Sequence, residues 1–217
     1  MKDVKYLLFD LDGTITASDE GITKSVQYAL HCLGIEEPDL NKLKPFVGPP
    51  LRVAFPQYYG LDKEKTEEAV SKYRERYSKE GIFECSVYDG MPDVLAKLKN
   101  KGYCIVLATS KPKIYAEKIL KHFNLDGYFT HVVGCELDGR LDTKSEIIEY
   151  AIELCADADK SHFIMIGDRF YDIEGAKQQG IRSVGVLYGY GSREELEGAG
   201  ADEICPEVKD IALLFGA

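Results

Sequence analysis

The chain has 217 residues, of which 45% are hydrophobic, and it carries a formal net charge of −10. That length fits one domain with an insertion or two small domains. The negative charge argues against a nucleic-acid polymer as partner, because phosphate backbones are bound by clustered Lys and Arg.

Three further features predict a cytoplasmic protein. No apolar run approaches the ~20 residues of a membrane span. The first residues lead directly into an apolar stretch, with no signal peptide before it. The six cysteines are scattered and form no Cys-x-x-Cys pair, which suits reduced thiols better than a disulfide framework.

The first apolar run, residues 6–9, predicts a buried strand that ends in Asp10 and Asp12. Residues i and i+2 of a strand share a face, so the two carboxylates point the same way, about 7 Å apart. Gly13 permits a sharp turn. A simple Asp-Gly turn is one interpretation, whereas an EF-hand loop fails because Ile15 stands where that loop needs glycine. A divalent cation together with a phosphoryl group would relieve the repulsion between the carboxylates.

The stretch between Thr14 and Cys85 is expected to be helical, with no strand. Apolar residues at helical spacing predict one helix that stops at Gly34, and Asp62 is the expected N-cap of another over about residues 63–79. Residues 38–56 are expected to be irregular.

From Met91 onward the pattern alternates between strand and helix. Helices are expected over residues 92–100, 114–122, 144–155, 171–179 and 208–215, with another after a capping box of Ser192 and Glu195. Strands are expected over residues 104–108, 131–134, 163–166, 183–187 and 201–204.

Nearly continuous apolar strands between helices predict the α/β class, with a Rossmann-like, doubly wound parallel sheet as the core. The core is expected over residues 1–14 and 88–217, and an inserted helical cap over residues 15–87. The two crossings, near residues 16–20 and 84–89, are candidate hinges.

Polar residues follow three of the predicted strands, at the edge where ligands of open α/β sheets bind. They are Asp10 and Asp12, then Thr109 and Ser110, then Asp168 and Asp172. The four histidines are dispersed, so a zinc site is not expected. Residues 189–191 lack the third glycine of a dinucleotide fingerprint and are expected to form a loop.

The sequence Asp-Leu-Asp-Gly-Thr at residues 10–14 resembles the nucleophile motif of the haloacid dehalogenase (HAD) superfamily, most of whose members are phosphatases. Thr109 matches its second motif, and Lys144 lies where the family has its lysine. Asp168 and Asp172 match its fourth motif, Gly-Asp-x-x-x-Asp. The resemblance extends over the whole chain.

The helical block looks like the C1 cap of the branch that holds phosphoglycolate phosphatases and β-phosphoglucomutases. Residues 47–51, 142–144 and 185–191 are similar to 5'-nucleotidase-like relatives of phosphoglycolate phosphatase. Ala17 and Ser145 depart from the pattern, since many members have Asp and Pro there.

The resemblance implies a role for each matching residue. Asp10 would attack phosphorus and Asp12 would act as acid and base. Mg²⁺ would be held by Asp10, the Asp12 carbonyl and Asp168, with Asp172 orienting a metal-bound water. The phosphoryl oxygens and the substrate would be bound by residues of the core and of the cap loop, namely Thr109, Ser110, Lys144, Gly13, Gly48 and Arg52.

The expected function is that of a Mg²⁺-dependent phosphatase acting on a small phosphorylated metabolite, with nucleoside 5'-monophosphates ahead of 2-phosphoglycolate. A β-phosphoglucomutase-like phosphotransferase has the same catalytic set. A dehalogenase is disfavoured because it needs no metal, and a binding module would be expected to lose Asp10 or Asp168. No membrane partner is expected, and the chain is expected to be a monomer or weak homodimer.

Overall fold

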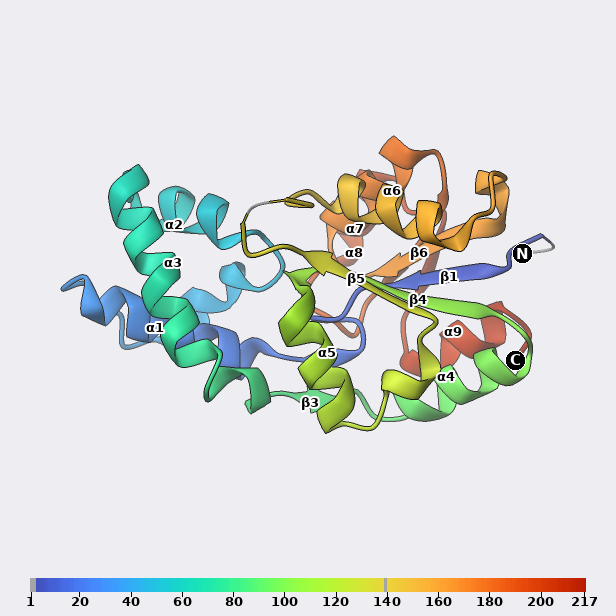
Figure 1. Cartoon of the computed structure of the whole chain (residues 1–217), viewed down its shortest axis with the longest axis horizontal. Helices are drawn as coiled ribbons and strands as arrows, with labels where there is room; N and C mark the ends of the chain where they lie inside the picture. The colour runs from blue at the N-terminus through green and yellow to red at the C-terminus, as the bar shows by residue number, and fades with distance from the viewer. Residues whose placement is uncertain (1–2, 139) are drawn as a thin grey trace. The chain divides into compact units, whose positions relative to one another are not determined.

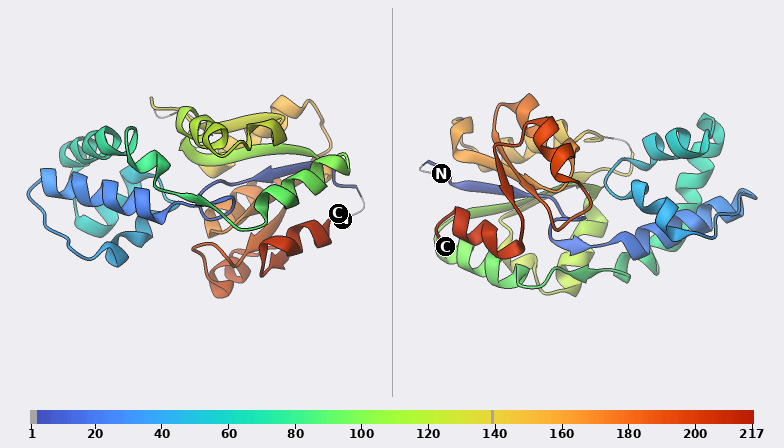
Figure 2. Two further views of the ribbon diagram at one scale, coloured as in Figure 1. Left: turned by 90° about the horizontal axis from the view of Figure 1, so that it is seen from below. Right: turned by 180° about the vertical axis from the view of Figure 1, so that it is seen from behind.

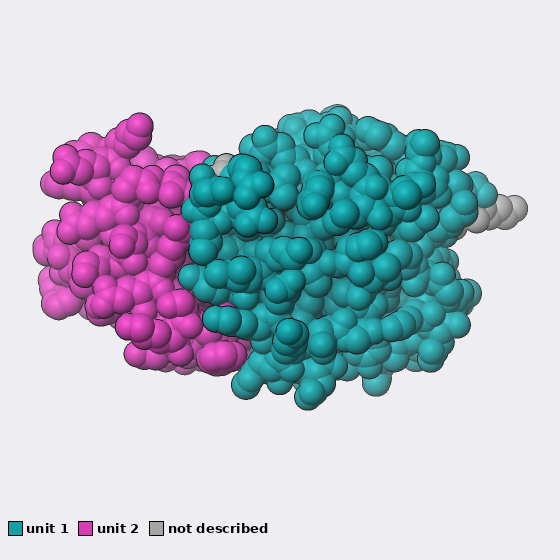
Figure 3. Space-filling view, in the orientation of Figure 1, with its two compact units in different colours: residues 1–16, 87–217 teal, residues 17–86 magenta. Residues whose placement is uncertain are grey.

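The computed structural model of the chain describes residues 3–138 and 140–217 (Figure 1). The chain divides into two compact units, coloured separately in Figure 3: unit 1 comprises residues 1–16 and 87–217, and unit 2 comprises residues 17–86. The expected core and cap were residues 1–14 with 88–217 and residues 15–87, so each boundary differs by one or two positions. Residues 1–2 of the expected core lie outside the described residues.

Unit 1 is built on a six-stranded parallel sheet with the strand order β5-β4-β1-β6-β7-β8. The strands are β1 (Tyr6–Phe9), β4 (Cys104–Pro112), β5 (His131–Cys135), β6 (Phe163–Gly167), β7 (Arg182–Val186) and β8 (Glu203–Cys205). The predicted fold class, a parallel α/β sheet, is confirmed. The first strand of the chain lies in the middle of the sheet, between β4 and β6.

The register of the three central strands brings their ends to one level. Phe9, the last residue of β1, is paired with Leu107 in β4 and with Ile166 in β6. The residues that follow in each strand therefore emerge at the same edge of the sheet, in its centre.

Strand β4 is longer than expected, because pairing with β5 continues beyond Ala108. Thr109 is paired with Gly134 and Pro112 with Cys135, and the register shifts between these two pairs. The irregularity lies where the chain reaches the sheet edge, and bulges of this kind redirect side chains.

Helices cover both faces of the sheet (Figures 1 and 2). They are α4 (Met91–Asn100), α5 (Lys113–His122), α6 (Lys144–Cys155), α7 (Phe170–Gln179), α8 (Arg193–Ala199) and α9 (Val208–Leu214), with short 3₁₀ turns η3 (Asp126–Tyr128) and η4 (Lys160–His162). Helices α6 and α7 pack together on one face, and α4 and α9 on the other.

The alternation of side chains along β1 explains why its residues are apolar without a break. Leu8 belongs to a buried cluster that includes Ile148 and Ala176 from α6 and α7. Leu7 and Phe9 are fully buried too and point to the opposite face. A strand that is covered on both sides has no polar face.

Unit 2 is helical, with α1 (Asp19–Cys32), η1 (Leu40–Phe46), α2 (Leu51–Tyr59), α3 (Lys63–Tyr77) and η2 (Gly81–Phe83). Helix α1 packs against α3, η1 and η2, and α2 packs against α3. Asp62 is the N-cap of α3, as predicted, and accepts a hydrogen bond from the Lys65 amide at 2.9 Å. Phe46 and Phe55 pack edge to face in the core of unit 2.

Two expectations for the helical block are wrong. Residues 38–56 are not irregular throughout, because η1 and the first part of α2 lie there. Pro45 and Pro56 lie inside these helices and hide the helical pattern, although each proline removes only one backbone donor. The stretch between Thr14 and Cys85 also contains a short strand, β2 (Thr16–Ala17), which pairs with β3 (Ser86–Val87) just after Cys85.

No helix in residues 3–138 or 140–217 is long and apolar enough to cross a membrane. The six cysteines all lie in this described part of the chain and form no disulfide in the structure.

Candidate active site

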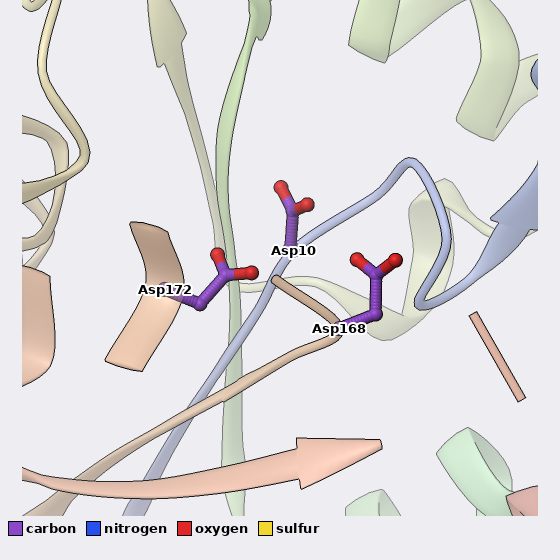
Figure 4. A group of neighbouring side chains, drawn as sticks. All are labelled: Asp10, Asp168 and Asp172. Carbon is purple, nitrogen blue, oxygen red and sulfur yellow. The ribbon is translucent and has the colours of Figure 1, made fainter. Parts of the chain in front are cut away.

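Three buried carboxylates meet at the centre of the sheet edge (Figure 4). Asp10 follows β1, Asp168 follows β6, and Asp172 lies in the first turn of α7. Each offers an oxygen within 4.8 Å of the others, and their exposed fractions are 6%, 0% and 1%. The predicted convergence of these residues is found in the structure.

Lys144 joins two of these carboxylates. Its Nζ lies 2.8 Å from Asp10 Oδ1 and 2.8 Å from Asp172 Oδ1, and it donates to the Ala108 carbonyl at 3.1 Å. Lys144 is the first residue of α6, whose start is fixed by a capping box between Thr143 and Glu146. Burial alone would lower the pKa of Lys144, but Asp10 and Asp172 outweigh it and raise that pKa, so the ammonium stays charged.

The cluster holds more negative charge than Lys144 balances. Burial, followed by the charges of Asp172 and Asp10, raises the pKa of Asp168 well above its usual range. Burial also raises the pKa of Asp172, to about 6, against the opposing effect of Lys144. Desolvated carboxylates this close together are stabilised by a divalent cation, and their oxygen donors are those that Mg²⁺ prefers. The residues present therefore fit a magnesium ion.

The loop at residues 188–191 holds Asp168 in place. The Tyr190 amide donates to Asp168 Oδ2 at 2.7 Å, and Thr14 Oγ1 lies 3.5 Å from Oδ1. The backbone at Gly13, with φ +83°, and at Gly189 lies close against this side chain, because a Cβ at either position would collide with it. The loop at residues 188–191 thus supports a candidate ligand of the metal.

Tyr188 connects the same loop to the turn after β1. Its hydroxyl donates to the Thr14 carbonyl at 2.9 Å, and its ring packs edge to face on Tyr88 with centroids 4.9 Å apart. Burial, the largest cause, raises the pKa of Tyr188 well above its usual value, so the hydroxyl remains a donor. The Asp10–Thr14 turn is therefore held by the hydrogen bond from Tyr188 as well as by backbone hydrogen bonds of the turn itself.

Asp12 is not one of the three carboxylates that lie within 4.8 Å of one another. It is paired with a residue that the sequence analysis missed. Its Oδ2 lies 2.9 Å from Lys111 Nζ, and the two side chains are 11% and 4% exposed. Lys111 follows Thr109 by two positions, which places it near the same edge of the sheet, but this spacing does not reveal that Asp12 is its partner.

Thr109 and Ser110 lie at the end of β4, as predicted. Thr109 is 1% exposed, and its Oγ1 accepts a hydrogen bond from the Lys111 amide at 3.2 Å. Ser110 is half-buried. The threonine hydroxyl therefore shapes the local turn in this structure, alongside its predicted role at the phosphoryl group.

The predicted substrate contacts of the cap, Gly48 and Arg52, belong to unit 2, whereas the clustered carboxylates belong to unit 1. Gly48 has a φ of +106° in the loop before α2. Arg52 makes a bidentate pair with Glu67 of α3, with Nε and a terminal nitrogen at 2.6 and 2.9 Å from its oxygens. The substrate contact of Arg52 stays a prediction.

Glu195 has a different role from the predicted one. Ser192 caps α8 by accepting from the Glu195 amide at 3.1 Å, but the Glu195 carboxylate does not complete a capping box. Its Oε1 instead accepts from the Phe170 amide at 3.0 Å and from Arg169 Nε at 2.8 Å. Glu195 thereby caps α7 and supports the turn between Asp168 and Asp172, a long-range role that local spacing does not reveal.

Comparisons with known proteins agree with this geometry. The family model "haloacid dehalogenase-like hydrolase" matches residues 7–186. A 5'-nucleotidase from Pseudomonas aeruginosa is 45% identical over 202 residues, which cover 93% of this chain and 91% of that protein. The crystal structure of a predicted phosphatase from Clostridium acetobutylicum is 46% identical, with a TM-score of 0.95 and 98% of each chain covered.

A third relative has a different name. The tyrosine-protein kinase PtkA from Mycobacterium tuberculosis is 35% identical over 193 residues, which cover 89% of this chain but 65% of the kinase. The family match, the two close relatives and the cluster at the sheet edge confirm the resemblance first seen at residues 10–14. The chain belongs to the haloacid dehalogenase-like hydrolase family, within which it is a phosphatase.

Proposed function

We propose that the chain is a Mg²⁺-dependent phosphatase that hydrolyses small phosphomonoesters through a phosphoryl group carried on Asp10. The observation that carries this proposal is the position of Asp10: its buried carboxylate lies at the centre of the sheet edge, 2.8 Å from Lys144 Nζ and beside Asp168 and Asp172. For stability alone, an apolar side chain would serve better than a buried carboxylate at this position.

Asp10, Asp168 and the Asp12 backbone carbonyl would hold the metal, with Asp172 orienting a water in its coordination sphere. The bound cation would supply charge neutralisation at the phosphoryl oxygens. Thr109, the Ser110 amide and Lys144 would provide donors for the same oxygens. The Gly13 amide donates to the Thr16 carbonyl at 2.7 Å, so Gly13 would contribute a close approach of the backbone and no donor.

Two displacements at phosphorus make up the reaction. In the first, the Asp10 oxygen that Lys144 does not hold forms a bond to phosphorus while the ester bond breaks, and Asp12 gives its proton to the departing oxygen. In the second, a water oxygen bonds to phosphorus while the Asp10–phosphorus bond breaks, and Asp12 takes the water's proton. Asp12 ends protonated, ready for the next ester.

Nucleoside 5'-monophosphates are the preferred substrates in this proposal, slightly ahead of 2-phosphoglycolate. The similarity to the 5'-nucleotidase supports that order, as does the motif in residues 47–51, where two prolines restrict the backbone of the expected substrate loop. Helical unit 2 would act as the C1-type cap that excludes water. The proposal places the enzyme in the cytoplasm, as a monomer or weak homodimer.

A phosphotransferase is the second candidate, because the relative with 35% identity is named as a tyrosine-protein kinase. The first displacement would be the same, and an acceptor hydroxyl would replace water in the second. The two candidates therefore differ in the fate of the phosphoryl group.

Release of inorganic phosphate from a panel of monoesters, with Mg²⁺ and after exhaustive treatment with EDTA, tests the proposal. We expect nucleoside monophosphates to release one phosphate per molecule, and only when the metal is present. The esters of the panel are ranked by kcat/KM. Full activity in EDTA would overturn the metal requirement. Transfer to an added sugar or peptide hydroxyl in preference to water would favour the phosphotransferase.

A further inference from the structure

Lys111 and Asp12 form a buried ion pair beside the carboxylate cluster. Lys111 Nζ lies 2.9 Å from Asp12 Oδ2, with side chains that are 4% and 11% exposed. Lys111 comes from the end of β4, and Asp12 from the turn after β1. A buried pair of this kind contributes little to stability compared with apolar packing, so its presence at the sheet edge calls for another reason.

The two oxygens of Asp12 have different surroundings. Oδ2 is held by Lys111, whereas Oδ1 is buried and has no hydrogen-bond partner in the described part of the chain. An unsatisfied buried oxygen is costly, and a purely structural ion pair would gain nothing from it. A proton donor needs this asymmetry, because one oxygen must be fixed while the other meets the reacting atom.

The position of Lys111 is fixed by the irregular end of β4. Its amide donates to Thr109 Oγ1 at 3.2 Å. The neighbouring strand β5 has Gly134 at this point, where a Cβ would lie 2.5 Å from the Lys111 carbonyl oxygen. The shift in register between Thr109 and Pro112 falls at the same place. The backbone that carries the lysine is therefore closely packed.

We propose that Lys111 is a positioning residue for proton transfer. By holding Asp12 Oδ2, it directs Oδ1 to the leaving oxygen of the ester and later to the attacking water. The inference rests on the proposed function, in which Asp12 is the acid and base. A direct contact between Lys111 and the substrate is the competing role.

The dependence of the rate on the leaving group separates the two roles. A nucleoside alkoxide must be protonated as it departs, whereas p-nitrophenolate leaves without a proton. We expect Lys111→Met to slow single-turnover cleavage of adenosine 5'-monophosphate by about 100-fold, the size of a general-acid contribution. Cleavage of p-nitrophenyl phosphate under the same conditions should fall only a few-fold, and KM for both esters should stay unchanged.

Two variants complete the experiment. Lys111→Arg keeps the cation and should recover part of the lost rate with adenosine 5'-monophosphate. Lys113→Met removes an exposed lysine two positions further on and should match the wild type with both esters. If Lys111→Met does not fold, Lys111→Arg still tests the inference through the relative rates with the two esters, because a guanidinium keeps the positive charge but changes the position of the Asp12 carboxylate.

Asp12→Asn distinguishes failure of this inference from failure of the proposed function. Equal losses on both esters in Lys111→Met, or a raised KM with unchanged kcat, would overturn the positioning role if Asp12→Asn shows the leaving-group pattern. If Asp12→Asn itself treats the two esters alike, the acid–base role of Asp12 in the proposed function is wrong, and the inference about Lys111 is overturned with it.

Discussion

Lys144 Nζ lies 2.8 Å from Asp10 Oδ1 although the two residues are 134 positions apart in the chain. The first residue of α6 and the first residue after β1 meet because the sheet places β1 in its middle and α6 packs over β4 and β5. The pair defines which Asp10 oxygen is held and which one is left for the chemistry.

Asp10→Asn should abolish turnover, because an amide does not serve as the nucleophile. We expect kcat to fall by at least about 1000-fold. The melting temperature should change little, because Lys144 keeps its ion pair with Asp172 and the loss of the Asp10 charge relieves repulsion among the clustered carboxylates. Steady-state phosphate release measures the first effect and circular dichroism the second. A variant that retains more than about a tenth of wild-type kcat would exclude Asp10 as nucleophile.

Lys144→Met should lower both activity and stability. Removal of a buried partner from an ion pair costs about 3–5 kcal/mol, because the carboxylates that remain are uncompensated. Urea unfolding without metal measures this loss, and excess Mg²⁺ should restore part of it by supplying positive charge. Unchanged stability in the metal-free state would mean that the pair is not formed in solution.

Gly189→Ala should weaken metal binding, although Gly189 is not itself a proposed metal ligand. A methyl group at this position would push on the Asp168 side chain and displace its oxygens. We expect a rise of 10-fold or more in the Mg²⁺ concentration for half-maximal activity, on the order of the effect of outer-shell mutations at other metal sites.

Gly198→Ala is the matched control for that prediction. Gly198 lies in α8, and a methyl group there would meet no other part of the described chain within 4 Å beyond its own helix. Its metal dependence should equal that of the wild type. If the two alanine variants behave alike, loop 188–191 does not position Asp168.

Arg52→Ala should raise KM for the preferred nucleotide while smaller model esters are affected less. The physical reason is that the core motifs reach only the phosphoryl group, so the remainder of the substrate must be recognised elsewhere. Arg140→Ala, at a side chain that is 74% exposed in unit 1, provides a control. Equal changes for every ester, or no change, would mean that Arg52 has no role in substrate recognition.

Much of this architecture follows from sequence because it depends on local pattern. Buried strands show as apolar runs, and the helix from Lys144 to Cys155 has the predicted bounds. Asp10, Thr109 and Asp168 were placed at one edge because parallel strands end together. Helix α2 was missed because Pro56 interrupts its pattern.

The supporting residues could not be predicted in the same way. Glu195 has the spacing of a capping box with Ser192, yet its carboxylate caps α7, which is 25 positions away in the chain. Lys111 looks like one more lysine after a strand until its partner, Asp12, is known. Such roles depend on which residues the fold brings together, and local spacing in the sequence does not show these long-range contacts.

The central claim is that Asp10 carries the phosphoryl group, and trapping of the enzyme during turnover tests it most directly. The wild-type protein would be acid-quenched while it cleaves adenosine 5'-[³²P]monophosphate with Mg²⁺, digested under acidic conditions and analysed by mass spectrometry. We predict one phosphoryl group per chain, on the peptide that contains Asp10, and none in Asp10→Asn or without metal. Release of phosphate with no labelled protein at any quench time, or with the label on another residue, would contradict the account.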